Sequence, residues 1–213
     1  MDNAELLAGQ DDEAKQPVRL LASFPSSMYG DMVVRYPYQE VSDYAYAYHE
    51  AARRLASTFS GRPEDDTILM PFLMLYRHAY ELRLKHLAAY LAGVRRRYRE
   101  PSTADLEPAN VQQRLRFEHG HRLAPLLAEV QEHFAALSLP SDFPASVVET
   151  IDLLHEADGT GMRFRYAHQL PDTQEQTNFP ALAAILDDQL ETLAVVEDYV
   201  EELFKYVPDD YTY

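Results

Sequence analysis

Residues Asp65 to Tyr98 read DDTILMPFLMLYRHAYELRLKHLAAYLAGVRRRY, the longest helix-compatible apolar stretch of the chain. Apolar residues fall on nearly every side of a helix drawn through it, and such a helix belongs at the centre of a bundle. Arg77, Glu81 and Lys85 are nevertheless spaced four residues apart in its middle third, so they stack on one face with the carboxylate between two cations. This stripe is either a buried salt-bridge network or part of a functional centre.

The pattern on both sides of this helix predicts an all-α fold, a four-to-five-helix up-and-down bundle with a long central helix and an extended crossing segment. Residues 100–118 are polar and contain two prolines, which predicts a long loop with a short helix near 111–115. Residues 159–170 alternate apolar and polar side chains, which predicts the extended segment. The expected helices are residues 41–59 with Ser42 as cap, a central helix from Asp65 or Asp66, residues 122–137, a helix capped by Ser141 or Asp142 and ending at Asp158, and residues 180–204.

A single domain, residues 17–206, is expected from the length of 213 residues. Residues 1–16 and 207–213 are acidic and lack an apolar period, which predicts a disordered tail at each end. No signal peptide is evident, and no uncharged apolar run approaches the roughly 20 residues that span a bilayer. We therefore expect a cytoplasmic protein without membrane contact. The chain has no cysteine, which excludes disulfides, thiolate zinc sites and cysteine nucleophiles.

Charge is distributed unevenly along the chain, whose formal net charge is -16. Residues 1–74 carry 6 positive and 12 negative side chains, residues 75–122 carry 10 and 5, and residues 123–213 carry 3 and 18. All of the positive excess therefore lies in the middle. This basic middle is either a local anion site or the electrostatic complement of the acidic C-terminal helix.

Arginine and histidine occur together at a spacing that helical endoribonucleases use without a metal ion. In that chemistry an arginine stabilises the charged phosphoryl transition state, and a histidine moves protons while the RNA 2′-hydroxyl attacks its own phosphate. An arginine separated from a later histidine by four to six residues is the pattern expected. The alternative is that these are surface residues of a polar loop. The pattern is met by Arg114 with His119 or His121, by Arg116 with His121 and by Arg163 with His168.

Several candidate metal ligands lie close together in the sequence. Glu118, His119 and His121 could be joined by His155 or Asp158. No HExxH motif occurs, and the single ExxH falls short of the two that a di-metal bundle needs. GxGxxG, GxxxxGK and GxSxG are also absent. The sequence therefore predicts neither a metal site nor a cofactor.

Three segments together resemble a group of uncharacterised bacterial HEPN-like proteins. They are FLMLYRHAYELRLKHL, GHRLAPLLAEV and GMRFRYAHQ, followed by a long C-terminal helix. The first matches an arginine-histidine-x-x-glutamate-leucine-x-leucine-lysine helix, the second a histidine-x-leucine helix entry, and the third a phenylalanine-arginine-tyrosine-proline segment in which Ala167 replaces the proline. The resemblance covers about residues 42–203.

This resemblance implies a helical bundle, often dimeric, in a superfamily that includes RNases of toxin-antitoxin and phage-defence systems as well as non-catalytic members. The expected partners are a second copy of the chain, an RNA substrate, and a protein partner or antitoxin. The alternative is a non-catalytic interaction or assembly module whose acidic face binds a protein. The expected catalytic residues are Arg77, His121 and Arg165. The expected supporting network is Glu81, Lys85, Arg163 and Tyr166, and Arg163 and Arg165 are the expected partners of Glu81. Weaker candidates are His78, Arg116 and His119.

Overall fold

Helices dominate the computed structural model, which describes residues 40–166 and 176–205. No strand occurs in these two ranges, so the prediction of an all-α fold is confirmed. The expected tails, residues 1–16 and 207–213, lie outside the described residues. The elements are α1 (Val41–Ala56), the 3₁₀ helix η1 (Pro63–Ile68), α2 (Leu69–Tyr98), the 3₁₀ turn η2 (Ala104–Leu106), α3 (Pro108–Gln113), the π-helix η3 (Arg114–His119), α4 (Leu123–Ala136), α5 (Ala145–Ala157) and α6 (Phe179–Phe204).

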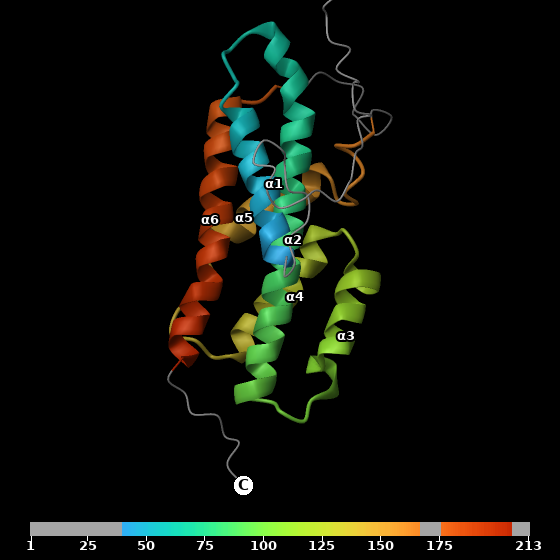
Figure 1. The fold of residues 1–213 in the computed structure, drawn as a ribbon, viewed down its shortest axis with the longest axis vertical. Helices are drawn as coiled ribbons and strands as arrows, with labels where there is room; N and C mark the ends of the chain where they lie inside the picture. The colour runs from blue at the N-terminus through green and yellow to red at the C-terminus, as the bar shows by residue number, and fades with distance from the viewer. Residues whose placement is uncertain (1–39, 167–175, 206–213) are drawn as a thin grey trace, which may run out of the picture. The chain divides into compact units, whose positions relative to one another are not determined.

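Consecutive helices alternate in direction around α2, as Figure 1 shows. Aromatic contacts fix the relation of α2 to α6. Phe72 meets Phe179 where both helices begin, with ring centroids 4.8 Å apart, and Tyr98 stacks on Phe204 at 5.0 Å where both end. These two helices therefore run parallel, and α1 lies against both in the opposite direction. The up-and-down arrangement is confirmed.

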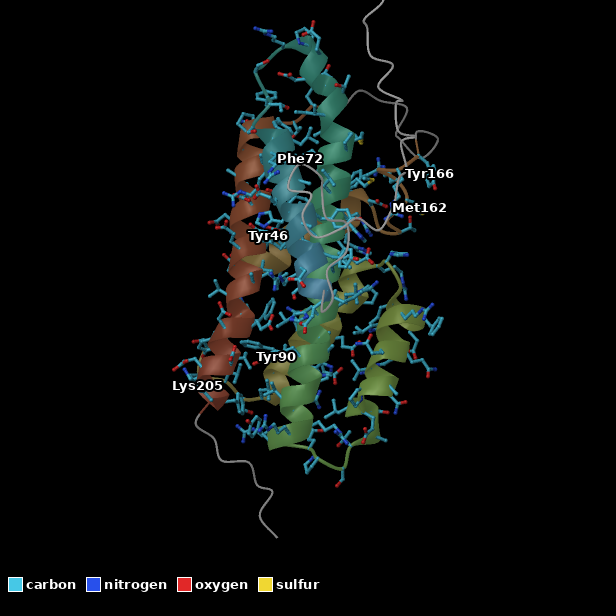
Figure 2. The ribbon with its side chains drawn as sticks, in the orientation of Figure 1. Tyr46, Phe72, Tyr90, Met162, Tyr166 and Lys205 are labelled. Carbon is cyan, nitrogen blue, oxygen red and sulfur yellow. The ribbon has the colours of Figure 1, made fainter. Side chains whose placement is uncertain are left out.

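The core is centred on α2, which packs against α1, α4 and α6. Phe72, labelled in Figure 2, is completely buried, as are several other large residues of this helix. A central position explains why its sequence is apolar nearly all round. No helix in the described part of the chain is long and apolar enough to cross a membrane. The fully buried side chains of α2 include Tyr80, Leu84, Leu87 and Leu91.

Helix ends follow local chemistry, and they differ from the prediction at several places: α1 ends at Ala56 and not at residue 59, α2 begins at Leu69 after a 3₁₀ helix, and two predicted caps are wrong. Asn178 caps α6, because its side-chain oxygen accepts a hydrogen bond from the backbone N–H of Ala181 at 3.3 Å. Ser42 does not cap α1, since Glu40 precedes the helix and its N–H donates to Asp43 at 2.7 Å. The prediction of Ser141 or Asp142 as the cap of α5 is also wrong. That helix begins after Pro144, two or three residues later than expected.

The prediction of a long loop at residues 100–118 is wrong, because most of this segment is helical. Pro108 is the first residue of α3. Proline is favoured at this position because a backbone N–H there has no partner within the helix, so proline loses no hydrogen bond. Leu106, Val111 and Leu115 are buried and attach the segment to the core. We call residues 104–119 the return segment, because they lead the chain from the end of α2 back to its middle.

The turns after α5 replace the expected extended segment as far as the structure describes it. The backbone N–H of Arg165 donates to the carbonyl of Met162 at 3.1 Å, and Gly161 has a φ of +80° that favours glycine. Residues 159–166 therefore form tight turns. The remainder of the predicted segment, residues 167–170, lies outside the described residues.

Candidate functional site

Glu81 is the centre of a polar cluster in the middle of α2. Lys85 Nζ lies 2.7 Å from Glu81 Oε1, and Arg77 Nη1 lies 3.6 Å from Oε2. From outside the helix, His121 Nδ1 approaches Oε1 to 2.9 Å. His78 Nδ1 stands 3.8 Å from Oε2, which is too long for a hydrogen bond. The predicted stripe of one carboxylate between two cations is confirmed, and His121 joins it from a distant part of the sequence.

The side chain of Glu81 is a buried carboxylate, 1% exposed. Burial raises its pKa, but the contacts with His78, Lys85 and His121 outweigh that effect and lower the pKa to about 2. Glu81 is consequently an anion at neutral pH and can only accept hydrogen bonds. Nδ1 of His121 must therefore carry the proton that joins the two side chains.

His121 differs from the rest of the cluster because its side chain is 58% exposed. The return segment places it there, just before the first residue of α4. With Nδ1–H directed at Glu81, the neutral imidazole has its free electron pair on Nε2. A carboxylate that fixes the tautomer in this way prepares a histidine to accept a proton at Nε2.

Arg77 is buried, 3% exposed, and ties three segments together. Its Nη2 donates to the backbone carbonyl of His121 at 2.7 Å, and its Nε donates to the carbonyl of Asp158 at 3.1 Å. Burial lowers the pKa of Arg77, the carboxylates of Asp158 and Glu81 oppose that change, and the charge of Arg165 adds to it. Arg77 therefore positions His121 through its backbone.

Asp158 organises the turns that follow α5. Its Oδ1 accepts hydrogen bonds from the backbone N–H groups of Gly161, Met162 and Arg163 at 2.8, 2.9 and 3.1 Å. Burial raises its pKa, but these N–H groups and the charge of Arg77 give a net lowering. Asp158 thus stays anionic and joins these turns to Arg77. The sequence pattern indicated Asp158 only as the end of a helix and as a candidate metal ligand.

Arg163 and Arg165, which lie on these turns, are not among the side chains that contact Glu81. Arg163 donates from Nη1 to the carbonyl of Ala157 at 3.0 Å, and Arg165 is exposed. Tyr166, labelled in Figure 2, is 47% exposed. The prediction that Arg163 and Arg165 pair with Glu81 is wrong, since its partners come from α2 and from His121. Arg165 is still close enough to Arg77 for their charges to repel.

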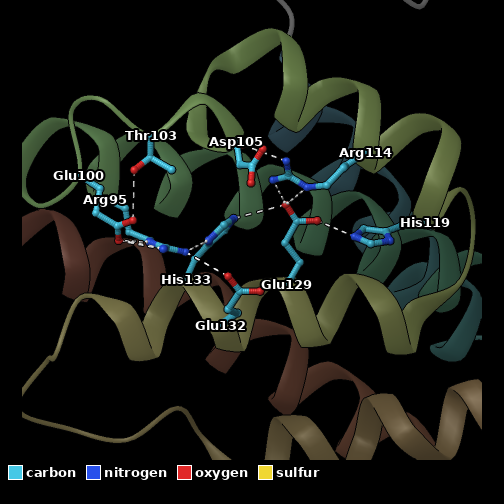
Figure 3. A network of polar contacts seen from close by, with 9 residues as sticks. All are labelled: Arg95, Glu100, Thr103, Asp105, Arg114, His119, Glu129, Glu132 and His133. Atoms are coloured by element: carbon cyan, nitrogen blue, oxygen red, sulfur yellow. Dashed lines mark hydrogen bonds and ion pairs between the residues drawn. The ribbon is translucent and has the colours of Figure 1, made fainter.

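A second buried carboxylate, Glu129 on α4, is the centre of the network in Figure 3. Arg114 Nη2 donates to its Oε1 at 2.7 Å, and His119 Nε2 lies 2.5 Å from its Oε2. His133 Nε2 reaches Oε1 at 3.3 Å. Burial raises the pKa of Glu129, but these contacts lower it to about 2. Glu129 therefore holds the π-helix η3 against α4.

This network continues to the end of α2 through His133, which is 2% exposed. Nη1 of Arg95 donates to Nδ1 of His133 at 2.7 Å, and Arg95 also binds Glu100 at 2.8 Å. Since an arginine can only donate, Nδ1 of His133 is unprotonated and Nε2 carries the proton toward Glu129. Both ring nitrogens are thus occupied, which makes His133 a structural residue.

The structure brings together one of the predicted arginine–histidine pairs, Arg114 with His119. Arg114 and His119 both bind Glu129, whereas His121 binds Glu81. Arg116 is exposed and lies over the ring of Phe117 at 5.0 Å. His168 lies outside the described residues. Glu129 was not among the predicted site residues, although its spacing of four residues from His133 on the inner face of α4 was a signal for it.

The Glu81–His121 pair can transfer protons at the surface, and Arg77 holds both of its members. Arg165, exposed near Arg77, adds a positive charge that can meet an anionic substrate. Comparisons of this chain with protein-family models, with curated proteins and with solved structures found no match. Any function must therefore be argued from the site itself.

Proposed function

We propose that this chain is a cytoplasmic HEPN-like protein of a prokaryotic toxin-antitoxin or phage-defence system, and that it acts as a metal-independent endoribonuclease. The observation that carries the proposal is the hydrogen bond of 2.9 Å between buried Glu81 and half-exposed His121. It fixes the tautomer in which Nε2 can remove a proton. The resemblance of the chain to HEPN-like proteins supplies RNA as the substrate.

In the proposed reaction, Nε2 of His121 removes the proton of an RNA 2′-hydroxyl. The 2′-oxygen forms a bond to the adjacent phosphorus, and the bond from phosphorus to the 5′-oxygen breaks. The products are a 2′,3′-cyclic phosphate and a 5′-hydroxyl, whose proton comes from the imidazolium or from water. Arg165 stabilises the phosphoryl charge, and Glu81 stabilises the imidazolium. Arg77 is a positioning residue, because its guanidinium is buried and bound to two backbone carbonyls.

The test is incubation of the purified protein with total RNA in EDTA. Cleavage by the wild type should fall by about 10²–10⁴-fold in His121→Ala, the range expected for loss of a general base. The matched control is His86→Ala. His86 Nε2 also binds a carboxylate, that of Glu197, at 3.0 Å, but His86 lies on a different part of α2 from Glu81. No cleavage by the wild type, or equal cleavage by His121→Ala, would overturn the proposal.

A non-catalytic role is the second candidate, and one observation favours it. Arg77 joins α2 to the entry of α4 and to the end of α5 through hydrogen bonds to two backbone carbonyls, as a structural arginine would. The acidic C-terminal helix would then bind a basic protein partner. Both candidates include a homodimer, which light scattering on the purified chain can measure. A protein that dimerises and captures such a partner without cleaving RNA would favour this second role.

A further inference from the structure

We propose that His49, Asp187 and Glu191 bind a divalent transition-metal ion, Zn²⁺ in particular, and so clamp α1 to α6. One ligand atom from each residue lies within 4.8 Å of the other two. His49 is on α1, whereas Asp187 and Glu191 are one turn apart on α6. In the part of the chain that the structure describes, this is the only such group of three. The proposal is independent of RNA cleavage.

The ligand set has the chemistry of a zinc site. Zn²⁺ takes imidazole nitrogen and carboxylate oxygen at about 2.0–2.2 Å, with three protein ligands and one water in an open site. His49 Nε2 already lies 2.6 Å from Asp187 Oδ1, so a small separation of the two groups admits an ion between them. The metal would replace the proton on Nε2, and affinity should fall as the pH is lowered.

Space for the ion comes from a pocket between the two helices. Its volume is about 170 Å³, and His49 and Glu191 line it together with Arg53 and with Arg83 of α2, whereas Asp187 does not. Small side chains, Ala45 on α1 and Ala194 on α6, leave this space open. The volume exceeds the roughly 30 Å³ that one water occupies in the liquid, so an ion and its water fit.

Tyr76 on α2 supports the site from the protein interior. Its hydroxyl donates to Asp187 Oδ1 at 3.0 Å. Burial raises the pKa of Tyr76, and the nearby charge of Asp187 raises it further, so the hydroxyl remains a donor. Hydrogen bonds of this kind orient carboxylate ligands toward a metal. Arg77, the next residue, points instead to the Glu81 cluster, and the two sites therefore lie on different sides of α2.

Arg53 is the cation that a metal ion would displace. Its Nε lies 3.4 Å from Asp187 Oδ1 and its Nη1 lies 3.5 Å from Glu191 Oε1, so both contacts are loose. The side chain is 50% exposed and can withdraw into solvent without unfolding either helix. A divalent ion would take the place of this arginine in compensating the charge of the two carboxylates.

The test is calorimetric titration of ZnCl₂ into the full chain after treatment with EDTA, together with thermal unfolding. Wild type should bind one Zn²⁺ per chain and should melt at a higher temperature with the metal. Affinity should fall about a hundredfold in His49→Ala and about tenfold in Glu191→Gln, whose exposed side chain carries little risk to folding. Arg53→Ala should bind more tightly, because the competing cation is gone.

The matched control is again His86→Ala, because His86 binds Glu197, which also pairs with Arg83, and no third metal ligand joins this pair among the residues that the structure describes. It should bind Zn²⁺ as the wild type does. Absence of saturable binding by the wild type would overturn the proposal. So would equal affinity in wild type, His49→Ala and Glu191→Gln, since the ion would then be bound by other histidines.

Discussion

A β-carbon on Gly161 would lie 2.7 Å from Nη1 of Arg77, closer than such atoms can approach. The turns after α5 therefore close over a buried guanidinium only because residue 161 has no side chain. Gly161 also has a φ of +80°, where other residues are strained. The space left by the missing side chain at residue 161 thus allows Arg77 to contact Asp158 and His121.

Gly161→Ala should destabilise the protein by about 2–4 kcal/mol, because strain at positive φ adds to displacement of a buried charge. Urea denaturation followed by circular dichroism would measure the change. Gly93→Ala is the control. Gly93 lies inside α2 with no atom within 4 Å of an added β-carbon, so alanine there should stabilise by about 0.5–1 kcal/mol. Equal effects at the two glycines would contradict this reading of residue 161.

Arg77 and Arg165 should respond differently to substitution. Arg77→Ala removes a buried partner of Glu81 and Asp158 and should cost about 3–5 kcal/mol of stability. Arg165→Ala removes an exposed side chain and should change stability by less than about 0.5 kcal/mol. If RNA binds as proposed, Arg165→Ala should also remove about one phosphate contact. The plot of the logarithm of the binding constant against the logarithm of the salt concentration should then be less steep. Fluorescence anisotropy with labelled RNA at several salt concentrations would show it.

Glu129→Gln should destabilise the protein by about 2–4 kcal/mol, because it leaves Arg114, His119 and His133 without their shared anion. Glu132→Gln is a matched control on the same helix. The side chain of Glu132 is 73% exposed and its contact with Arg95 is 3.4 Å, so its loss should cost less than about 1 kcal/mol. Thermal and urea unfolding of both variants would test whether the network in Figure 3 stabilises the fold. Similar costs would count against the central role of Glu129.

Acid should weaken the fold through the two buried carboxylates. The pKa of Glu81 and of Glu129 is lowered from 4.5 to about 2 in the folded state, so the unfolded chain binds protons more readily. Their stabilisation is complete above a pH of about 4.5 and is lost as the pH falls toward 2. The difference between the folded and unfolded pKa corresponds to about 3 kcal/mol of stability for each carboxylate, because one pKa unit is worth about 1.4 kcal/mol.

Urea unfolding at a series of pH values from 7 to 3 would measure this loss. Glu129→Gln should lower stability at pH 7 and flatten the decline below pH 4.5, because one of the two titrating carboxylates is gone. Glu132→Gln should leave the slope unchanged. An identical slope in wild type and Glu129→Gln would show that other groups cause the acid sensitivity.

The sequence predicted the central helix and its polar stripe, because both depend on local spacing. Residues four apart on a helix must share a face, so Arg77, Glu81 and Lys85 could be placed together before any fold was known. The loop prediction at residues 100–118 failed for an equally local reason. Its two prolines indicated a loop, because proline interrupts a helix. Pro108 instead begins α3, and buried residues attach the segment to the core.

Tertiary structure alone decided which histidine faces which carboxylate. His119 and His121 are two residues apart, yet one binds Glu129 and the other Glu81, because the chain turns at Gly120 with a φ of +60°. The His49, Asp187 and Glu191 group was equally invisible to motif searches, since 138 residues separate His49 from Asp187. The sequence by itself determined an all-α bundle around an apolar helix, through periodicity that each segment carries alone. Its polar sites arise only where remote segments pack together, and local periodicity does not encode that contact.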